Sequence, residues 1–208
     1  RVYPDKAVVM GCDKELTEIQ IPEQVQNVNV TEIHSEAFRS HENLKSAELP
    51  ETITSIGNSA FYLSALEHVN LPENLTELGL SAFSGTNLSE ITIPNGITDL
   101  NGGMFYDCKN LKSVTLPENL QTIGANAFFN CAVETITIPE AVKCIRWNTF
   151  ADCSALKEIT LPESVAQIEE TAFRGCVKLE KITILNPNCQ IYDRQDTICN
   201  VYAEHELP

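Results

Sequence analysis

Short stretches in which apolar and polar residues alternate recur along almost the whole chain. The segment Leu111–Cys131, LKSVTLPENLQTIGANAFFNC, shows one full unit: an alternating stretch, a proline, a second apolar pair and an Ala-Phe dipeptide. Alternation with a period of two predicts a short β-strand with one buried face and one exposed face. The repeat prolines are Pro22, Pro50, Pro72, Pro94, Pro117, Pro139 and Pro162, and the repeat phenylalanines are Phe38, Phe61, Phe83, Phe105, Phe128, Phe150 and Phe173.

The period of this repeat predicts the fold. Successive phenylalanines are 22 or 23 residues apart, and from Pro50 onward each proline precedes its phenylalanine by eleven residues. Self-similarity at this period, with leucine or isoleucine in fixed columns, is typical of a leucine-rich solenoid. We therefore predict a mainly β fold with short helical or 3₁₀ turns. It should be a right-handed leucine-rich repeat solenoid of about seven coils of 22–23 residues, with N- and C-terminal caps.

The array accounts for most of one elongated domain. Residues 1–15 are predicted to form the N-terminal cap, residues 16–184 the repeat array, and residues 185–208 a C-terminal cap and tail. Caps would cover the apolar surface and the strand edge that an open solenoid exposes. The first coil holds five extra residues around positions 26–30, which predict a bulge or a short hairpin.

Each coil is expected to contain a strand, a second apolar pair on the opposite wall, and a closing turn. The strands are predicted at Leu44–Leu49, Leu66–Leu71, Leu88–Ile93, Leu111–Leu116, Val133–Ile138, Leu156–Leu161 and Leu179–Ile184. Their outward column reads Gln20, Glu48, Asn70, Thr92, Thr115, Thr137, Thr160 and Thr183, and threonine suits an exposed parallel sheet. Gly57, Gly79 and Gly124 follow the second apolar pair, where we expect positive φ. The Ala-Phe segment is expected to form a short helical or 3₁₀ turn that inserts its phenylalanine into the core.

Charge and hydropathy exclude several classes of partner. The chain has 29 acidic and 14 basic residues, a net charge of -15 at pH 7. Nucleic acids and anionic membranes are bound by lysine and arginine, so we expect neither as a partner. No run approaches the roughly 18 apolar residues that span a bilayer, so we expect no membrane insertion by these residues. An acidic surface fits a secreted protein better.

Cysteine placement argues against a disulfide framework and against a metal site. Four of the eight cysteines stand three residues after a repeat phenylalanine: Cys108, Cys131, Cys153 and Cys176. A column of parallel thiols favours buried small side chains, because a disulfide needs two Cβ atoms turned toward each other. No CxxC pair exists, and we expect no metal and no cofactor. Cys189 and Cys199 lie outside the column and are a candidate disulfide. Cys144 lies in an outward column with Thr122 and Gln167 and is the candidate free thiol.

The unit LPxxLxxIGxxAFxxCxxLxxIxLP resembles the BspA-type leucine-rich repeat of bacterial surface and secreted proteins. The resemblance covers roughly residues 15–184, and the flanks GCDKELTEIQIP and ITILNPNCQIYD are also similar to the ends of such arrays. It implies a bacterial protein at the cell surface or outside the cell, with a role in adhesion or protein binding, and it supplies no catalytic residues. Arg146 and Glu169 depart from the usual glycine of the unit.

Catalytic chemistry is not expected, because a regular solenoid offers flat walls where an enzyme needs converging groups. His68 and Glu90 fall in one outward column of adjacent coils, so an acid–base pair is conceivable there. A solvated surface pair is the simpler interpretation. We therefore predict no catalytic residues and keep His68 and Glu90 as candidate ligand contacts.

Aromatic residues are the stronger candidates for ligand contact. The column one past each repeat phenylalanine contains Tyr62, Tyr106 and Phe129, and Trp147 lies in a nearby column. Aromatic side chains with one wet edge are favoured in protein hot spots and in stacking on sugars. The alternative interpretation is that they shield the corner of the coil.

Two functions remain open at this stage. The first is a non-enzymatic extracellular binding or adhesion module that presents a rigid solenoid surface to a protein or glycan ligand. The second is a structural spacer or stalk that positions another domain of a larger secreted or cell-surface protein. Surface aromatics favour the first function, and the repetitive threonine column favours the second.

Overall fold

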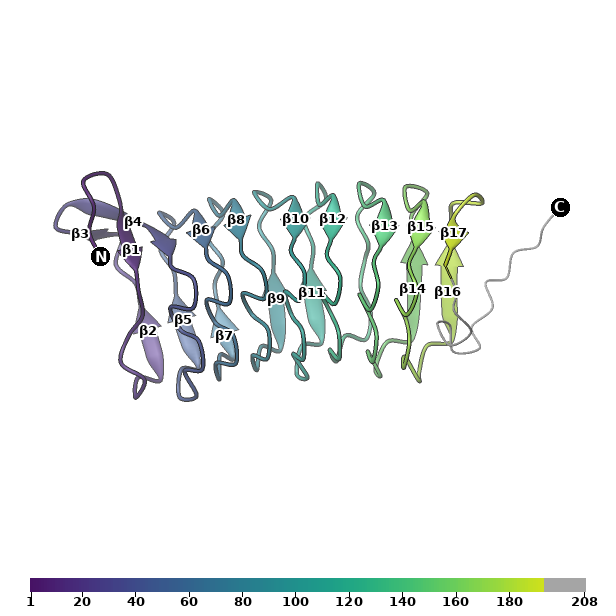
Figure 1. Cartoon of the computed structure of the whole chain (residues 1–208), viewed down its shortest axis with the longest axis horizontal. Coiled ribbons are helices and arrows are strands. Elements are labelled where there is room, and N and C mark those ends of the chain that lie inside the picture. Colours follow the sequence, from purple (N-terminus) through teal and green to yellow (C-terminus); the bar gives the residue numbers. More distant parts are fainter. Residues whose placement is uncertain (193–208) are drawn as a thin grey trace.

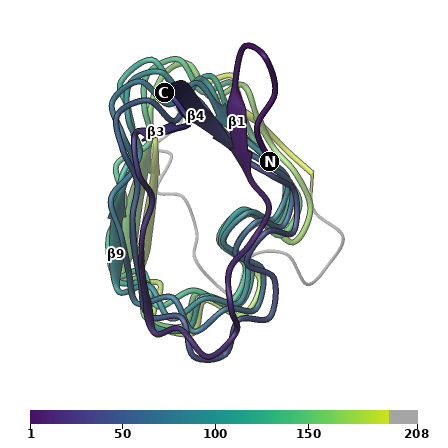
Figure 2. The ribbon, with the colours of Figure 1, turned by 90° about the vertical axis from the view of Figure 1, so that its left-hand side faces the viewer.

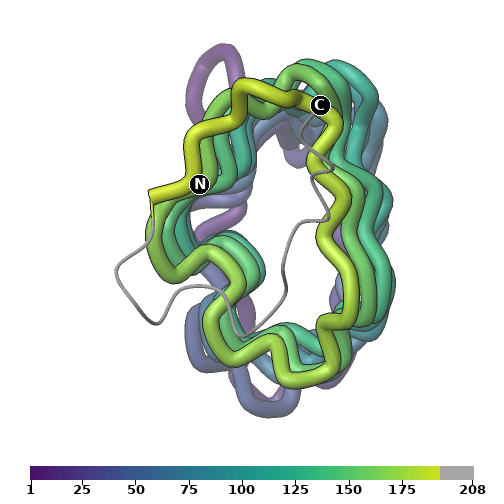
Figure 3. The backbone as a smooth tube through the Cα atoms, turned by 90° about the vertical axis from the view of Figure 1, so that its right-hand side faces the viewer, coloured from purple at the N-terminus to yellow at the C-terminus, as the bar shows by residue number. Residues whose placement is uncertain are grey.

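The computed structural model describes residues 1–192 and is a β-solenoid of about eight turns, stacked along one axis (Figure 1). Viewed along this axis, the coils superpose into a closed ring (Figures 2 and 3). No helix occurs within residues 1–192. The leucine-rich solenoid predicted from the repeat is therefore confirmed, and the number of coils roughly fits the prediction.

Two walls of the ring are built from short parallel strands. The sheet wall contains β2 (Glu18–Gln20), β5 (Ser46–Glu48), β7 (His68–Val69), β9 (Glu90–Thr92), β11 (Ser113–Thr115), β14 (Glu158–Leu161) and β16 (Lys181–Ile184). The pair wall contains β1 (Ala7–Val9), β4 (Val28–Ile33), β6 (Ser55–Ile56), β8 (Glu77–Leu78), β10 (Asp99–Leu100), β12 (Thr122–Ile123), β13 (Cys144–Ile145), β15 (Gln167–Ile168) and β17 (Gln190–Ile191). Figure 2 shows β9 of the sheet wall on the left and β4 of the pair wall at the top.

The strands keep the predicted register. Ala47 pairs with Val69, Ile91 with Val114, and Ile159 with Ile182, so each apolar column continues from coil to coil. The predicted outward column from Gln20 to Thr160 is exposed. One face of each strand therefore builds the core, and the other faces water.

The sheet wall is interrupted at two places within the described chain. β7 does not pair with β9, and Val133–Ile138 forms no strand, which corrects one prediction. Directly after the β5–β7 pairing, the Asn70 carboxamide takes the place of a backbone partner. Its Oδ1 accepts from the Leu49 N–H and its Nδ2 donates to the Leu49 carbonyl, both at 2.9 Å. Val133–Ile138 keeps the alternating pattern but lacks the ladder pairing with a neighbouring coil that defines a strand.

The insertion in the first coil forms the expected hairpin. β3 (Gln24–Val25) pairs antiparallel with the start of β4. The two residues between them, Gln26 and Asn27, have φ of 54° and 63°. Positive φ at both central positions is the geometry of the two-residue hairpin turn whose twist matches that of the strands.

The third wall consists of the Ala-Phe segments, and we call it the turn wall. It comprises residues 35–40, 58–63, 80–85, 102–107, 125–130, 147–152 and 170–175, three before to two after each repeat phenylalanine. Neither a helical nor a 3₁₀ turn forms in these segments, contrary to expectation. Two residues of each segment, two before and two after the phenylalanine, have positive φ, as Ser59 at 54° and Leu63 at 55° do.

Positive φ at these two places lets the backbone alternate between two sets of hydrogen bonds. Ser59, Phe61 and Leu63 donate to carbonyls of the next coil at 2.8 Å. Tyr62, between them, donates within its own coil, to the Ser59 carbonyl at 3.1 Å. A continuous helix would direct every N–H along one chain, so stacking between coils is what selects the turn.

The core is a column of stacked phenylalanines. All seven repeat phenylalanines are buried, and the ring centroids of neighbours lie 5.0 to 6.0 Å apart. The ladder thiols line the same core: Cys131 Sγ lies 3.0 Å from the Phe105 carbonyl, and Cys153 Sγ lies 3.0 Å from the Phe128 carbonyl. The four column cysteines are buried and reduced, as the column argument predicted.

Gly57, Gly79 and Gly124 do not have positive φ, which corrects the expectation for them. They are required for close packing instead. A Cβ on Gly79 would lie 2.3 Å from the Asn58 backbone nitrogen of the preceding coil. Gly57 and Gly124 meet the preceding backbone in the same way, at 2.4 and 2.5 Å.

Candidate functional site

The six candidate contact residues fall on two different walls. Tyr62, Tyr106, Phe129 and Trp147 all belong to the turn wall. His68 lies in β7 and Glu90 in β9, on the sheet wall across the ring (Figure 2). The structure therefore brings the aromatic candidates to one surface and leaves the two titratable candidates on another.

On the turn wall, three of the aromatic candidates each have one ring face in contact with another side chain of the same wall. The rings of Tyr106 and Phe129 stack with centroids 4.7 Å apart and planes 7° apart. The Arg39 guanidinium lies 5.1 Å from the centroid of the Tyr62 ring. Tyr62 and Phe129 are half-buried and Tyr106 is exposed, so their remaining surface faces water. These residues thus both shield the corner of the coil and form an accessible apolar strip.

Trp147 is held by its backbone and exposes its indole. The Trp147 N–H donates to Glu169 Oε2 at 2.9 Å, and its carbonyl accepts from the Asn126 N–H at 3.2 Å. Glu169, which replaces the usual glycine of the unit, therefore fixes the peptide of Trp147. The two preceding residues in the column of Trp147 are Gly102 and Ala125, so the side chains beside the indole are small.

Two further apolar residues belong to this surface, and the sequence analysis did not select them. Between Val25 and Val177 the exposed large hydrophobic residues are Leu80 (53 % exposed), Leu63 (49 %), Trp147 (48 %) and Tyr106 (39 %). All four lie on the turn wall. Leu63 stands in a column otherwise occupied by serine, glycine, aspartate and asparagine. This contrast in the sequence could have identified Leu63 as an exposed apolar residue.

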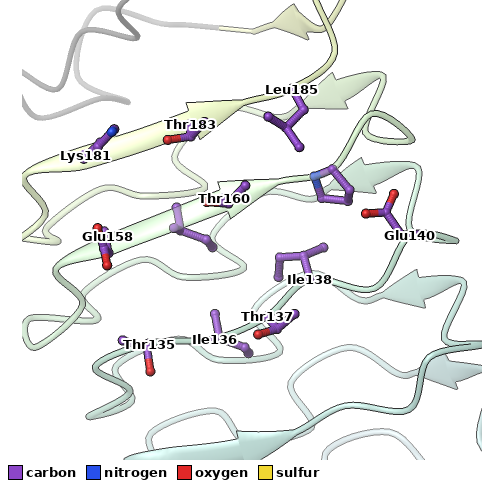
Figure 4. A pocket seen from close by; sticks show the side chains of 12 residues that line it. Thr135, Ile136, Thr137, Ile138, Glu140, Glu158, Thr160, Lys181, Thr183 and Leu185 are labelled. Atoms are coloured by element: carbon purple, nitrogen blue, oxygen red, sulfur yellow. The ribbon is translucent and has the colours of Figure 1, made fainter.

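The sheet wall carries two shallow grooves, each at an interruption of the strand ladder. The larger, of about 560 Å³, is lined by residues that include His68, Asn70 and Glu90. The smaller, of about 370 Å³, runs over Thr135–Ile138 toward Leu185, with Thr137, Thr160 and Thr183 along it (Figure 4). His68 and Glu90 share the larger groove, but no ion pair joins them within the described residues.

The cysteines outside the ladder are half-buried and reduced in the described part of the chain. Burial, followed by the carboxylate of Glu169, raises the pKa of Cys144 to about 11. Cys144 Sγ lies 3.7 Å from Glu169 Oε1. Burial also raises the pKa of Cys189. Its proposed disulfide partner, Cys199, lies outside the described residues.

Within residues 1–192, no cluster of three or more histidine, cysteine, aspartate or glutamate side chains is arranged to hold a metal ion. The same residues contain no helix of the length and apolarity that crosses a membrane. The arrangement on the turn wall can offer apolar contact, and that on the sheet wall can offer shallow polar grooves.

Comparison with sequence families gives one match, to the BspA type leucine rich repeat region, in six copies over residues 9–105 and 76–195. A comparison with curated proteins finds no match. Among solved structures, the Treponema pallidum leucine rich repeat protein TpLRR is 22% identical, with a TM-score of 0.56, over 88% of this chain and 80% of that one.

Two further solved structures are similar. The pneumococcal vaccine antigen PcpA is 23% identical, with a TM-score of 0.55, over 88% of this chain and 55% of its own. A leucine rich cell surface protein from Faecalibacterium prausnitzii is 22% identical, with a TM-score of 0.49, over 87% of this chain and 64% of its own. At these identities the likeness to TpLRR and PcpA shows the fold.

Proposed function

This chain belongs to the BspA-type leucine-rich repeat family, and from that premise we propose that it is a non-enzymatic binding module displayed at or outside a bacterial cell surface. Its task is to present a rigid solenoid surface to a protein or glycan ligand. The turn wall is the proposed contact surface, with Trp147, Tyr106, Phe129 and Tyr62 as its aromatic residues.

One observation carries the proposal. Between Val25 and Val177, every exposed large hydrophobic side chain of the chain lies on the turn wall. Monomeric proteins scatter such residues singly, and a gathering of them on one face marks an interaction surface. The sheet wall exposes mainly threonine and charged residues.

The scaffold suits binding because it loses little conformational freedom when a ligand docks. Backbone hydrogen bonds join neighbouring coils along the whole turn wall, and the phenylalanine stack fills the centre. A surface that is already ordered avoids the entropic cost of ordering side chains and loops on binding. The residues of the turn wall are therefore preorganised for contact.

A second function has its own supporting observation. The outward column from Thr92 to Thr183 repeats one residue type over five coils of the sheet wall. Uniform, polar and repetitive faces suit a structural spacer or stalk that positions another domain of a larger secreted or cell-surface protein. In that case the array would have no ligand of its own.

The test is a binding screen of the purified chain against a glycan array and a panel of extracellular-matrix proteins at two salt concentrations. Trp147→Ala is the test variant. Leu185→Ala is the matched control, because Leu185 is 49 % exposed but lies on the sheet wall. Saturable binding that Trp147→Ala loses and Leu185→Ala keeps supports the proposal. Binding that Leu185→Ala alone reduces moves the site to the sheet wall, and silence throughout favours the spacer.

A further inference from the structure

We infer that the occupant of the turn wall is a short segment of another protein that brings apolar side chains, and that Leu63 and Leu80 are specificity residues for it. This inference rests on the proposed binding function and narrows it to one ligand class. It follows from the charge, the side-chain sizes and the ring orientations of the wall.

The centre of the turn wall carries no charge, and Asp107 and Asp152 stand at its edge, directly after two of the uncharged segments. Five segments of five residues, 58–62, 80–84, 102–106, 125–129 and 147–151, contain no aspartate, glutamate, lysine or arginine. In every segment the phenylalanine and the residue before it are buried in the core, and among the other fifteen residues about three would be charged in a chain that is 21% charged. Loss of charge together with gain of aromatic residues distinguishes the core of a protein interface from other surface.

Ion pairs flank this uncharged centre at both ends, and the pair of Lys109 with Asp107 flanks it along one edge. In the first coil Glu36 and Arg39 form an ion pair of 2.7 Å. At the other end Arg174 lies 3.8 Å from Asp152. An apolar centre with a charged rim is the anatomy of a protein-binding patch.

Large and small residues alternate between two columns of the wall. Leu80 and Trp147 stand three residues before their phenylalanines, and in those coils the position after the phenylalanine is small and buried: Ser84 and Ala151. The two coils between them show the reverse, with Gly102 and Ala125 first and Tyr106 and Phe129 second. The large side chains therefore surround a shallow depression in the middle of the patch, where a protruding apolar side chain of the ligand fits.

Ring orientation favours a protein over a glycan. A sugar ring stacks on an aromatic face, but Tyr106 and Phe129 cover one face of each other, and Arg39 lies over Tyr62. Leu63 and Leu80, which are among the most exposed apolar residues of the wall, offer no ring at all. Aliphatic groups and ring edges bind apolar side chains by burying surface from water.

The extent of the patch sets the size of the occupant. Coils stack about 4.8 Å apart, so the five coils that contribute the uncharged segments span roughly 20 Å along the solenoid axis. A helix of about 13 residues, or about six extended residues, has this length. The patch therefore matches a peptide segment lying along the axis rather than a whole domain face.

The experiment uses a phage-displayed library of random 16-residue peptides, selected on the immobilised chain, with affinities of the selected peptides measured by calorimetry. Test variants are Leu63→Asp and Leu80→Glu. Both variants should fold, because acidic residues already occupy these columns. Asp107 and Asp152 stand in the column of Leu63, and Glu170 stands in the column of Leu80. Leu185→Glu is the matched control on the sheet wall. Thermal unfolding confirms that each variant is folded.

We expect most independent peptides to be rich in apolar residues, to lose affinity by about tenfold or more with either test variant, and to keep it with Leu185→Glu. Peptides insensitive to both test variants would overturn the inference. So would a wild-type dimer in sedimentation velocity that Leu80→Glu dissociates, because a second copy would then cover the wall. Glycan binding lost in Leu80→Glu, without peptide binding, would end this inference but leave the proposed function standing. No binding of either kind would end both.

Discussion

The Leu63 side chain lies directly over Gly85 of the next coil, and both residues have positive φ, 55° and 69°. A leucine in this backbone region is an outlier, because its Cβ crowds the following carbonyl. Asparagine tolerates the region and occupies the same column at Asn130, where φ is 54°. The leucine is thus kept at some cost in stability, at one edge of the proposed contact surface.

We predict that Leu63→Asn stabilises the fold by about 0.5–1 kcal/mol while weakening peptide binding. The measurement is the urea midpoint of both proteins, with calorimetry on a selected peptide. Leu80→Asn is the control, since it makes the same chemical change at a residue whose φ is not positive. If both variants change stability equally, backbone strain at Leu63 is not the cause.

Close approach between coils leads to a second prediction. A Cβ on Gly79 would lie 2.3 Å from the Asn58 nitrogen, whereas one on Gly102 would lie 3.3 Å from the Ala125 carbonyl oxygen. Gly79→Ala must therefore push two coils apart, and should cost roughly 1–3 kcal/mol. Gly102→Ala should cost less. Chemical denaturation of both variants checks the order, and equal losses would mean that the neighbouring coil yields without cost.

The repeat predicted most of the fold because it shows two periods at once. Alternation located the strands, and the 22–23-residue spacing stacked them, so the buried columns, the phenylalanine core and the reduced thiol column are confirmed. The strand at Val133–Ile138 was wrong, since a strand needs ladder hydrogen bonds to a neighbouring coil as well as the local pattern. The glycine prediction was wrong for a similar reason. Gly79 is required because the backbone of the preceding coil lies close to it, and one repeat alone does not reveal that contact.

The candidate surface was predictable only in part. Aromatic columns were visible in the sequence, whereas the role of Leu63 and Leu80 needed their exposure and the φ of Leu63. His68 and Glu90 share a column, but the ladder breaks between their strands. The division into caps and array, the disulfide of Cys189 with Cys199, and the ligand itself stay predictions.

The thiol column leads to a prediction about alkaline stability. Burial raises the pKa of Cys108 from 9.0 to about 11. As pH rises past 9, the unfolded state loses this proton first, so the stabilisation present below pH 9 declines toward pH 11. At pH 10.5 the loss from this thiol is about 2 kcal/mol relative to pH 8.

Cys108→Ser removes that titration, and a hydroxyl is already accepted in the column at Ser64, where Oγ donates to the Phe61 carbonyl at 2.8 Å. We expect the stability of Cys108→Ser relative to wild type to improve by about 2 kcal/mol between pH 8 and pH 10.5. Urea unfolding at both pH values measures it. A difference that stays constant with pH would show that the thiol ionises equally in both states.

The last prediction concerns the Cys144 thiol, whose reactivity depends on its pKa as well as on its exposure to solvent. Cys144 is more accessible than the ladder thiols, so we expect iodoacetamide to modify it before them. Its pKa of about 11 keeps it mainly protonated at neutral pH, so the rate should rise about tenfold per pH unit between pH 7 and pH 10.

Glu169→Gln should lower the pKa of Cys144 and speed its modification at pH 8, because the carboxylate beside the thiol disfavours the thiolate. The amide oxygen of glutamine can still accept from the Trp147 N–H, which preserves the local backbone. Glu158→Gln, on the sheet wall, is the matched control and should leave the rate unchanged. Peptide mapping by mass spectrometry over time gives the rates. Equal rates in wild type and Glu169→Gln would mean that burial alone sets the reactivity of Cys144.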